Sequence, residues 1–285
     1  MAGILYVVAT PIGNLEDVTL RALRILREVS LIAAEDTRRT ARLLQHYSIS
    51  TRTTSLHEHN EREKTPKLVE RLRAGDSMAL VSDAGTPLIS DPGQTLVAAA
   101  RDAGIRVEAV PGPSAVMAAL SSSGLPARTF TFLGFPPNRS KDRIEWLRKV
   151  ARMDLLVVFF EAPHRILQTL DDLQAIIGPD RIVGVGRELT KAHEELVIRP
   201  ISDLLRHFTK PLGEFTVLIP PSTSGPAGAM ELPSVEELRQ EIGQMTDNLG
   251  LRGRDALKVL ADRYGTTVNA LYRLISEPPT GGRTT

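Results

Sequence analysis

The stretch Met78–Pro87 reads MALVSDAGTP, and it decides the fold. Its first half, Met78–Ser82, is apolar and of strand length, and it leads into a loop, Asp83–Gly93, that is rich in small residues. The segments Ile4–Ala9 and Val107–Val110 have the same design, each a short apolar run ahead of a Pro/Gly loop. Because segments with helical spacing separate these runs, the strands are expected to be parallel and to carry helices on both faces of the sheet.

Strand and helix patterns continue to alternate up to residue 219. The spacing predicts further strands at 31–34, 130–133, 155–160, 182–185, 195–198 and 215–219. It predicts helices at 19–28, 38–46, 67–73, 96–103, 114–120, 141–152, 164–176 and 201–208. The second half therefore repeats the theme of the first, and the fold class is α/β, with two α/β domains and a small C-terminal helical appendix.

A change of composition near residue 220 marks where the α/β part ends. The segment Pro220–Gly228 reads PPSTSGPAG, which is typical of a flexible linker. Helical spacing returns at 235–245, 255–264 and 268–275. We therefore expect an N-terminal α/β domain over 1–120, a second α/β domain over 121–221, a linker over 222–233 and a helical appendix over 234–276.

Composition narrows the classes of function. The chain has 285 residues, no cysteine and a formal net charge of +1. Disulfides and thiolate metal sites are thereby excluded, and a cytoplasmic protein is expected. No apolar run approaches the roughly 20 residues that span a bilayer, so no membrane role is expected. Since the net charge is nearly zero, any contact with nucleic acid must use local basic patches.

Three loops carry the strongest chemical signal. They are Thr10–Asn14, Ser82–Pro87 and Val110–Ala115, and each follows the carboxyl end of a predicted strand. Ligands of parallel α/β sheets bind at that edge, and small residues let the backbone approach them closely. Tight turns alone would explain one such loop, but three on one edge favour a binding site. No dinucleotide or P-loop motif is present, and the pair His57 and His59 lies in a polar stretch, so no metal is expected.

Eight ordered motifs resemble one family. They are VVATPIGNLEDVTLRA at 7–22, AAEDTRRTARLL at 33–44, ALVSDAGTPLISDPG at 79–93, VPGPSA at 110–115, FLGFPP at 132–137, FFEAPHRI at 159–166, RELTKAHEE at 187–195 and GEFTVLI at 213–219. Together they resemble the tetrapyrrole-methylase superfamily and, within it, the bacterial enzymes that 2′-O-methylate a cytidine ribose of 16S rRNA in the decoding region. The resemblance implies a homodimer that binds S-adenosyl-L-methionine in a cleft between two α/β domains and acts on 16S rRNA or the small ribosomal subunit.

The resemblance also implies which residues contact the methyl donor. They are Pro11, Asp83, Gly85, Thr86, Pro87, Ile89, Ser114, Ala115, Phe160, Glu161, Leu189 and Thr216. The tetrapyrrole branch has Gly-Gly-Asp-Pro where this chain has Ala84–Pro87. That departure favours the RNA branch, and it weakens the assignment of Thr86, whose side chain replaces a carboxylate.

A ribose 2′-hydroxyl is a poor nucleophile at neutral pH, so the site must share or remove its proton. Candidates for the base or for an orienting group are Asp36, His164, Glu188 and Lys191, of which Asp36 and Lys191 are favoured. Lys191 requires a pKa lowered by burial to act as a base. Candidates for contacts with the RNA are Arg38, Arg39, His164 and Arg165.

Two further segments leave alternatives open. Arg139–Arg152 is basic around Trp146, which indicates an RNA-facing patch or an ordinary amphipathic helix. Arg252–Ile275 looks like a small helix-turn-helix, but acids interleave with its bases, so an appendix that packs or helps to hold the substrate is favoured over DNA binding. The competing functions are a small-molecule methylase of the tetrapyrrole type and a non-enzymatic nucleic-acid-binding regulator.

Overall fold

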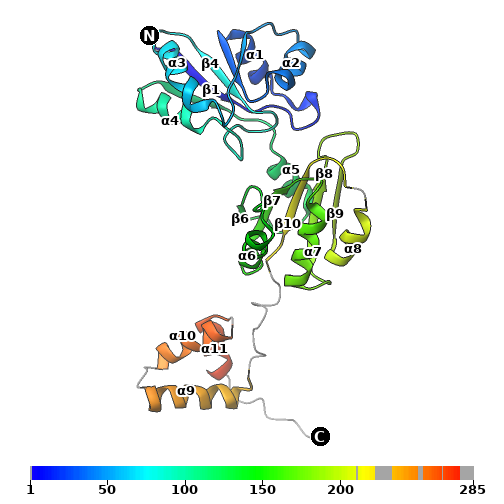
Figure 1. Cartoon of the computed structure of the whole chain (residues 1–285). Coiled ribbons are helices and arrows are strands. Elements are labelled where there is room, and N and C mark those ends of the chain that lie inside the picture. Colours follow the sequence, from blue (N-terminus) through cyan, green and yellow to red (C-terminus); the bar gives the residue numbers. More distant parts are fainter. Residues whose placement is uncertain (1, 210, 222–232, 250–252, 265, 277–285) are drawn as a thin grey trace. The chain divides into compact units, whose positions relative to one another are not determined.

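The computed structural model describes residues 2–209, 211–221, 233–249, 253–264 and 266–276. The chain separates into two compact units, Met1–Pro220 and Pro221–Thr285 (Figure 1). The first unit contains two five-stranded sheets with their helices, and the described elements of the second are helices. The predicted α/β class is confirmed. Most of the predicted linker, residues 222–232, lies outside the described residues.

The first sheet is parallel throughout. Its strands are β1 (Ile4–Val8), β2 (Leu31–Ala34), β3 (Thr53–Ser55), β4 (Met78–Val81) and β5 (Arg106–Val110), in the order β3-β2-β4-β1-β5. Every residue of β2 and β4 is buried, as is typical of strands that are covered on both faces. The sequence did not predict β3, because a three-residue Thr-Thr-Ser segment carries no apolar signal.

Helices cover both faces of this sheet. On one face α1 (Leu20–Glu28) and α2 (Thr37–His46) pack over the strands, and on the other face lie α3 (Glu61–Arg73) and α4 (Gln94–Asp102). A short helix, η1 (Leu15–Asp17), precedes α1. The α3 helix begins at Glu61 rather than at Lys67, and it contains Pro66 in its second turn.

The second sheet is mixed, which corrects the expectation that the second half repeats the first. Its strands are β6 (Phe130–Phe132), β7 (Leu156–Glu161), β8 (Ile182–Arg187), β9 (Glu195–Pro200) and β10 (Phe215–Ile219), in the order β6-β7-β10-β8-β9. Only β6 and β7 pair in parallel. A turn over residues 188–194, rather than a helix, joins β8 to β9, and so short a connection makes the two strands antiparallel.

The two faces of the second sheet have different covers. The helices α6 (Ser140–Val150), α7 (Ile166–Ile177) and α8 (Ile201–His207) pack on one face around Phe159 and Val217. The other face packs against α5 (Ala115–Ser123), through a core that includes Leu120, Leu156 and Leu218. The predicted domain boundary between residues 120 and 121 therefore falls inside a helix that packs on the second sheet.

A buried ion pair joins two helices of the second sheet. Arg143 of α6 donates from Nε to a carboxylate oxygen of Asp172 on α7 at 2.8 Å, and its Nη2 lies 2.8 Å from the same oxygen. The side chains are only 7% and 11% exposed. The basic helix α6 thus turns one of its arginines inward, while Arg148 and Lys149 stay exposed.

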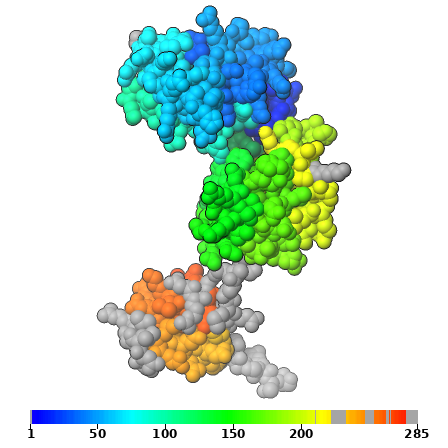
Figure 2. Space-filling model, viewed as in Figure 1, coloured from blue at the N-terminus to red at the C-terminus, as the bar shows by residue number. Residues whose placement is uncertain are grey.

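The described residues of the C-terminal unit form three helices. It comprises α9 (Val235–Leu249), α10 (Gly253–Arg263) and α11 (Val268–Ser276). Leu238, Leu260 and Leu271 belong to a core of its own, and Figure 2 shows the described residues of this unit in orange to red. Among the described residues, no helix is both long and apolar enough to cross a bilayer.

Candidate functional site

The three small-residue loops meet at the carboxyl edge of the first sheet, as predicted, because β4, β1 and β5 are neighbours there. Thr10 and Gly85 exchange two backbone hydrogen bonds, of 2.8 and 3.0 Å. The Thr86 hydroxyl donates to the carbonyl oxygen of Pro113 at 3.4 Å. A side chain on Gly85 would contact Ile12 and the Pro113 carbonyl, and its φ of +79° favours glycine. The loops therefore form one continuous surface.

The loop after β4 has an unusual backbone. Leu88 and Ser90 adopt left-handed φ angles of 73° and 68°, which non-glycine residues rarely do. Ile89, between them, is 50% exposed. Strained residues of this kind cluster at ligand sites, where the surrounding structure holds them in place. The loop thus presents an apolar side chain to solvent at the edge where a ligand is expected.

The turn between β8 and β9 touches the first of these loops. Glu188 and Thr190 also have left-handed φ angles, of 50° and 68°. The backbone N–H of Asn14 donates to the Thr190 hydroxyl at 3.1 Å. A side chain on Gly13 would lie 2.8 Å from that hydroxyl oxygen and 3.1 Å from the carbonyl oxygen of Leu189. Gly13 is therefore needed for the close approach of these two segments.

Two pockets flank this contact. The first, which we name the α2 pocket, has a volume of about 380 Å³. It is lined by Thr10, Pro11, Ile12, Gly13, Leu15, Arg39, Thr40, Arg42, Leu43, Ser82, Asp83, Ala84, Lys191 and Glu214. The second, the α5 pocket, has a volume of about 640 Å³. Its lining includes Ile12, Asp17, Gly112, Ser114, Met117, Phe130 and Thr190. Ile12 lines both pockets, so their occupants would be close neighbours.

The predicted donor residues of the first sheet are divided between these pockets. Pro11 and Asp83 line the α2 pocket, and Ser114 lines the α5 pocket. Ser114 is the N-cap of α5, and its hydroxyl accepts from the backbone N–H of Met117 at 3.4 Å. Gly85 and Pro87 are buried in the loop between them, and Ala115 packs in the core beneath.

The predicted donor residues of the second sheet have different surroundings. Phe160 of β7 pairs with Thr216 of β10 and lies in an aromatic group with Phe132 and Phe135. The backbone N–H of Phe160 donates to the carbonyl oxygen of Gly134, where a side chain would lie 3.2 Å from the Ser90 hydroxyl. Phe160 is thus linked to the loop after β4. Leu189 is buried against Gly186 and is a member of the α5 core.

Glu161 and Arg165 form an ion pair, and their other partners belong to the same half of the chain. The Glu161 carboxylate is 1% exposed and accepts a hydrogen bond of 2.6 Å from the Thr169 hydroxyl. Arg165 lies 3.4 Å from that carboxylate, and it donates to the carbonyl oxygens of Pro136 and Pro137 at 2.9 Å. His164 is exposed and makes no hydrogen bond with any described residue. Of these predicted substrate contacts, His164 is the one whose side chain is free.

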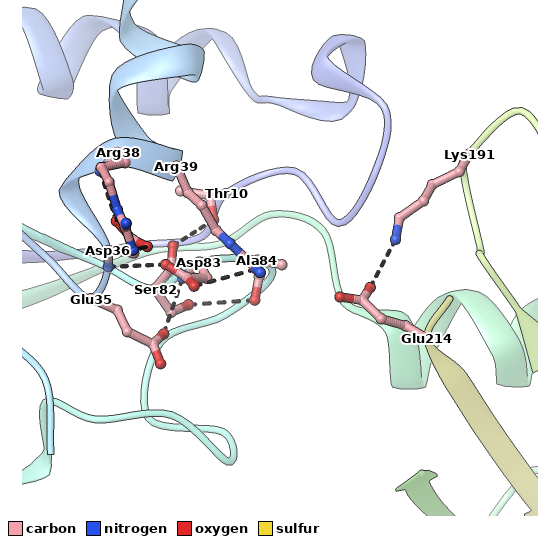
Figure 3. Close-up of polar contacts among 10 residues, drawn as sticks. All are labelled: Thr10, Glu35, Asp36, Arg38, Arg39, Ser82, Asp83, Ala84, Lys191 and Glu214. Carbon is pink, nitrogen blue, oxygen red and sulfur yellow. Dashed lines mark hydrogen bonds and ion pairs between the residues drawn. The ribbon is translucent and has the colours of Figure 1, made fainter. Parts of the chain in front are cut away.

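A group of carboxylates lies where β2 and β4 end (Figure 3). The backbone N–H of Asp36 donates to Asp83 at 3.0 Å, and that of Asp83 donates to Glu35 at 3.2 Å. Burial raises the pKa of Glu35 above its ordinary value, although a hydrogen bond from the Asp83 backbone opposes the shift. Burial also raises the pKa of Asp91 to about 6. A hydrogen bond from Ser82 opposes this shift, whereas the negative charges of Glu35 and Asp83 increase it.

Asp36 has the opposite electrostatics. It is the N-cap of α2 and accepts from the backbone N–H of Arg38 at 2.8 Å, and the Arg38 guanidinium donates to both of its oxygens, at 3.1 and 2.8 Å. These hydrogen bonds lower the pKa of Asp36 to about 2. A carboxylate with so low a pKa is a weak base, so the geometry favours the orienting role that was considered for Asp36. Arg38 itself is 89% exposed.

Lys191 lies across the α2 pocket from Arg39 and Asp83 (Figure 3). Its ammonium donates to Glu188 at 2.8 Å and to Glu214 at 3.0 Å. Partial burial alone lowers the pKa of Lys191, but the two carboxylates outweigh it and raise the pKa above its ordinary value. The condition under which Lys191 acts as a base is therefore absent, and the residue serves this pocket as a cation.

Sequence reasoning did not select Asp91, Arg42 or Glu214. Asp91 lies in a quoted motif, but its environment depends on Glu35, which is distant in the sequence. Arg42 follows Arg39 by one helical turn, and that spacing alone places both on one face of α2. Among the described residues, no group of three or more His, Cys, Asp or Glu side chains is arranged to hold a metal ion.

Known proteins match both the sequence and the fold. A model of the tetrapyrrole (corrin/porphyrin) methylases matches residues 4–205. The chain is 45% identical over 276 residues to ribosomal RNA small subunit methyltransferase I of Vibrio cholerae, which covers 95% of this chain and 94% of that protein. The methyltransferase CobJ has a TM-score of 0.60 at 19% identity, covering 81% of this chain and 98% of its own.

A second solved structure is uroporphyrin-III C-methyltransferase from Thermus thermophilus complexed with S-adenyl homocysteine. Its TM-score is 0.54 at 20% identity, and the match covers 76% of this chain and 97% of that one. Similarity at this level concerns the fold, whereas the relative from Vibrio cholerae is similar in sequence over nearly the whole length. The resemblance that the eight motifs indicated is confirmed, and the chain belongs to the tetrapyrrole (corrin/porphyrin) methylase family.

Proposed function

We propose that this protein is a methyltransferase that uses S-adenosylmethionine to methylate 16S rRNA, at the ribose 2′-hydroxyl of a cytidine in the decoding region. The observation that carries the proposal is the meeting of three small-residue loops between two pockets that share Ile12. Relatives named ribosomal RNA small subunit methyltransferase I, 45% identical over 276 residues in one case, support the choice of rRNA. The solved relative that is complexed with S-adenyl homocysteine supports the choice of donor.

The residues present suit such a donor. An adenosine linked to an amino acid needs apolar contacts for its base and polar groups for its ribose and its charged end. The loops supply the hydroxyl of Ser114, the carboxylate of Asp83 and carbonyl oxygens, and two large apolar side chains, Ile89 and Met117, are 50% and 53% exposed beside them. The donor supplies a methyl group on a positively charged sulfur, so the reaction itself requires no metal.

The chain's own residues then have to position the acceptor. In this proposal Asp36 orients the ribose, held in place by Arg38 and by the N-terminus of α2. Arg38, Arg39 and Lys191 supply positive charge for the phosphates of the strand. Alignment of the reacting atoms accounts for several kcal/mol of barrier in reactions of this kind, which is why an orienting carboxylate matters even when it is a weak base.

We also propose that the protein works in the cytoplasm and as a homodimer, as the resemblance implies. Sedimentation equilibrium at micromolar concentration measures the oligomeric state directly. A monomer at every concentration would remove the dimer from the proposal and leave the reaction untouched.

The central test is methyl transfer. Small subunits from cells that lack the gene are incubated with the protein and tritiated S-adenosylmethionine, and the modified nucleotide is mapped. We expect one 2′-O-methylcytidine in 16S rRNA, and a Gly85→Arg variant that still folds should lose donor affinity, because its side chain enters the space between the loops. Transfer to a tetrapyrrole acceptor instead of RNA would favour the small-molecule alternative, and absence of donor binding would favour the regulator.

A further inference from the structure

The α2 pocket differs from the α5 pocket in its charge. Three cations line it: Arg39 and Arg42 from α2 and Lys191 from the turn after β8. Two carboxylates, Asp83 and Glu214, line it as well. Asp83 pairs with Arg39 at 3.3 Å, and Glu214 pairs with Lys191 at 3.0 Å. Lys191 also pairs with Glu188, at 2.8 Å. Arg42 is the lining cation that has no carboxylate partner among the described residues.

Two polar groups of this pocket have no partner among the described residues. Arg42 is exposed and makes no hydrogen bond or ion pair with any residue that the structure describes. Thr40 lines the pocket, and its hydroxyl also has no partner within the described part of the chain. A hydroxyl at a pocket wall without a protein partner is available to bond a ligand or water. Both groups come from the same helix, α2, and both line the same pocket.

Part of the wall is apolar. Pro11, Ile12 and Leu15 come from the loop after β1 and from η1, and Leu43 comes from α2. At about 380 Å³ the pocket lies within the range of small-molecule sites, about 300–1,000 Å³. An apolar wall suits the face of a base, a free guanidinium suits a phosphate, and a free hydroxyl suits a sugar or base edge. A single nucleotide combines these three features.

We propose that the α2 pocket receives one nucleotide of the RNA substrate, turned out of its stack, with Arg42 on its phosphate and Thr40 on its sugar or base. This inference rests on the proposed function and assigns it an acceptor site. Enzymes that modify a nucleotide commonly extrude it into a pocket, and a pocket fixes the position of the reacting group. Pro11 and Asp83 of the predicted donor site also line the α2 pocket. The shared residue Ile12 puts the nucleotide next to the α5 pocket, where Ser114 belongs to the same predicted site.

The variants that test this are Arg42→Gln and Thr40→Val, with Arg101→Gln as the matched control. Arg101 is also exposed and without a partner among the described residues, but it lies at the end of α4 that leads into β5, at the opposite edge of the sheet. KM for small subunits, kcat and the salt dependence of KM are measured for each variant, and donor affinity is measured by calorimetry. Circular dichroism verifies folding.

Arg42→Gln is expected to raise KM for small subunits by about 5- to 150-fold and to reduce the salt slope by about 1. Thr40→Val is expected to raise KM by about 2- to 10-fold with an unchanged salt slope, since one neutral hydrogen bond is lost. Donor affinity should stay at the wild-type value in both. If Arg42→Gln matches Arg101→Gln in KM and salt slope while wild type is active, the α2 pocket is not the acceptor site.

A separate measurement distinguishes this failure from failure of the proposed function. If wild-type protein transfers no methyl group to RNA, binding of a short cytidine-containing RNA is titrated directly. Binding that Arg42→Gln weakens and Arg101→Gln leaves unchanged would keep the nucleotide pocket while the methylation proposal falls. Equal binding by all three proteins would overturn both.

Discussion

Asp91→Asn should stabilise the protein at neutral pH. Burial, opposed by a hydrogen bond from Ser82 and reinforced by the charges of Glu35 and Asp83, raises the pKa of Asp91 from 3.8 to about 6. The folded protein therefore keeps a proton on Asp91 over about pH 4 to 6 that the unfolded chain has already lost, and the free energy of unfolding falls as the pH rises through this window. Above pH 6 the carboxylate is charged in an unfavourable place.

The magnitude follows from the pKa difference. A change from 3.8 to about 6 corresponds to at most about 3 kcal/mol in the free energy of unfolding. Asp91 is only half-buried, and water screens its charge, so about 1 kcal/mol is the realistic expectation. The amide that the Asp91→Asn substitution introduces has no charge to bury, and it retains the capacity to bond Ser82.

Urea denaturation followed by circular dichroism at pH 4, 5, 6 and 7 measures the effect. The variant should equal wild type near pH 4 and exceed it by about 1 kcal/mol at pH 7. Asp171→Asn, an exposed carboxylate on α7, is the control and should show no such trend with pH. A difference that is the same at every pH, or a variant less stable than wild type at pH 7, would refute the account of Asp91.

Three further predictions concern packing. Arg143→Ala leaves Asp172 buried without its cation and should cost about 3–5 kcal/mol in urea denaturation, against less than about 0.5 kcal/mol for the exposed Arg148→Ala; equal losses would contradict this. Gly13→Ala should weaken donor binding by calorimetry, because its methyl group collides with Lys191 and Thr190, whereas Gly243→Ala, with open space around it, should not. Truncation after Pro221 should leave the donor affinity and melting temperature of residues 1–220 unchanged and weaken RNA binding, since the C-terminal unit has its own core; unfolding of the truncated chain would show the tail to be structural.

Local pattern was sufficient for the first sheet and its loops. The runs ILYVV and MALV and the Pro/Gly loops after them are short-range signals, so the shared sheet edge followed from them directly. The pairing of β8 with β10 is not local, since residues 184–187 meet residues 215–218 across the intervening β9 and α8. Alternation of strands and helices therefore predicted the elements of the second half without their directions.

The electrostatics of the site were also less predictable, because they depend on contacts between residues that are distant in the sequence. Lys191 is a candidate base by sequence, but its protonation depends on Glu214, 23 positions away. Asp36 behaves differently from Asp91 because Arg38 is two residues from it, whereas Asp91 faces acids that folding brings near. Residue types indicate which groups titrate. The direction in which each pKa shifts depends on the neighbours that folding brings to the edge of the sheet.

The outermost strands of the two sheets influence whether the protein aggregates at high concentration. An unpaired strand edge is a template for pairing with another chain, and hence for aggregation. The outermost strands β3 and β6 have three residues each, too few to recruit a partner firmly. The other two, β5 and β9, carry charged residues, among them Arg106 and Arg199, and β9 ends in Pro200, which has no N–H to donate. Each edge is short or charged, so we expect the protein to stay dispersed at high concentration and to refold without forming intermolecular sheet.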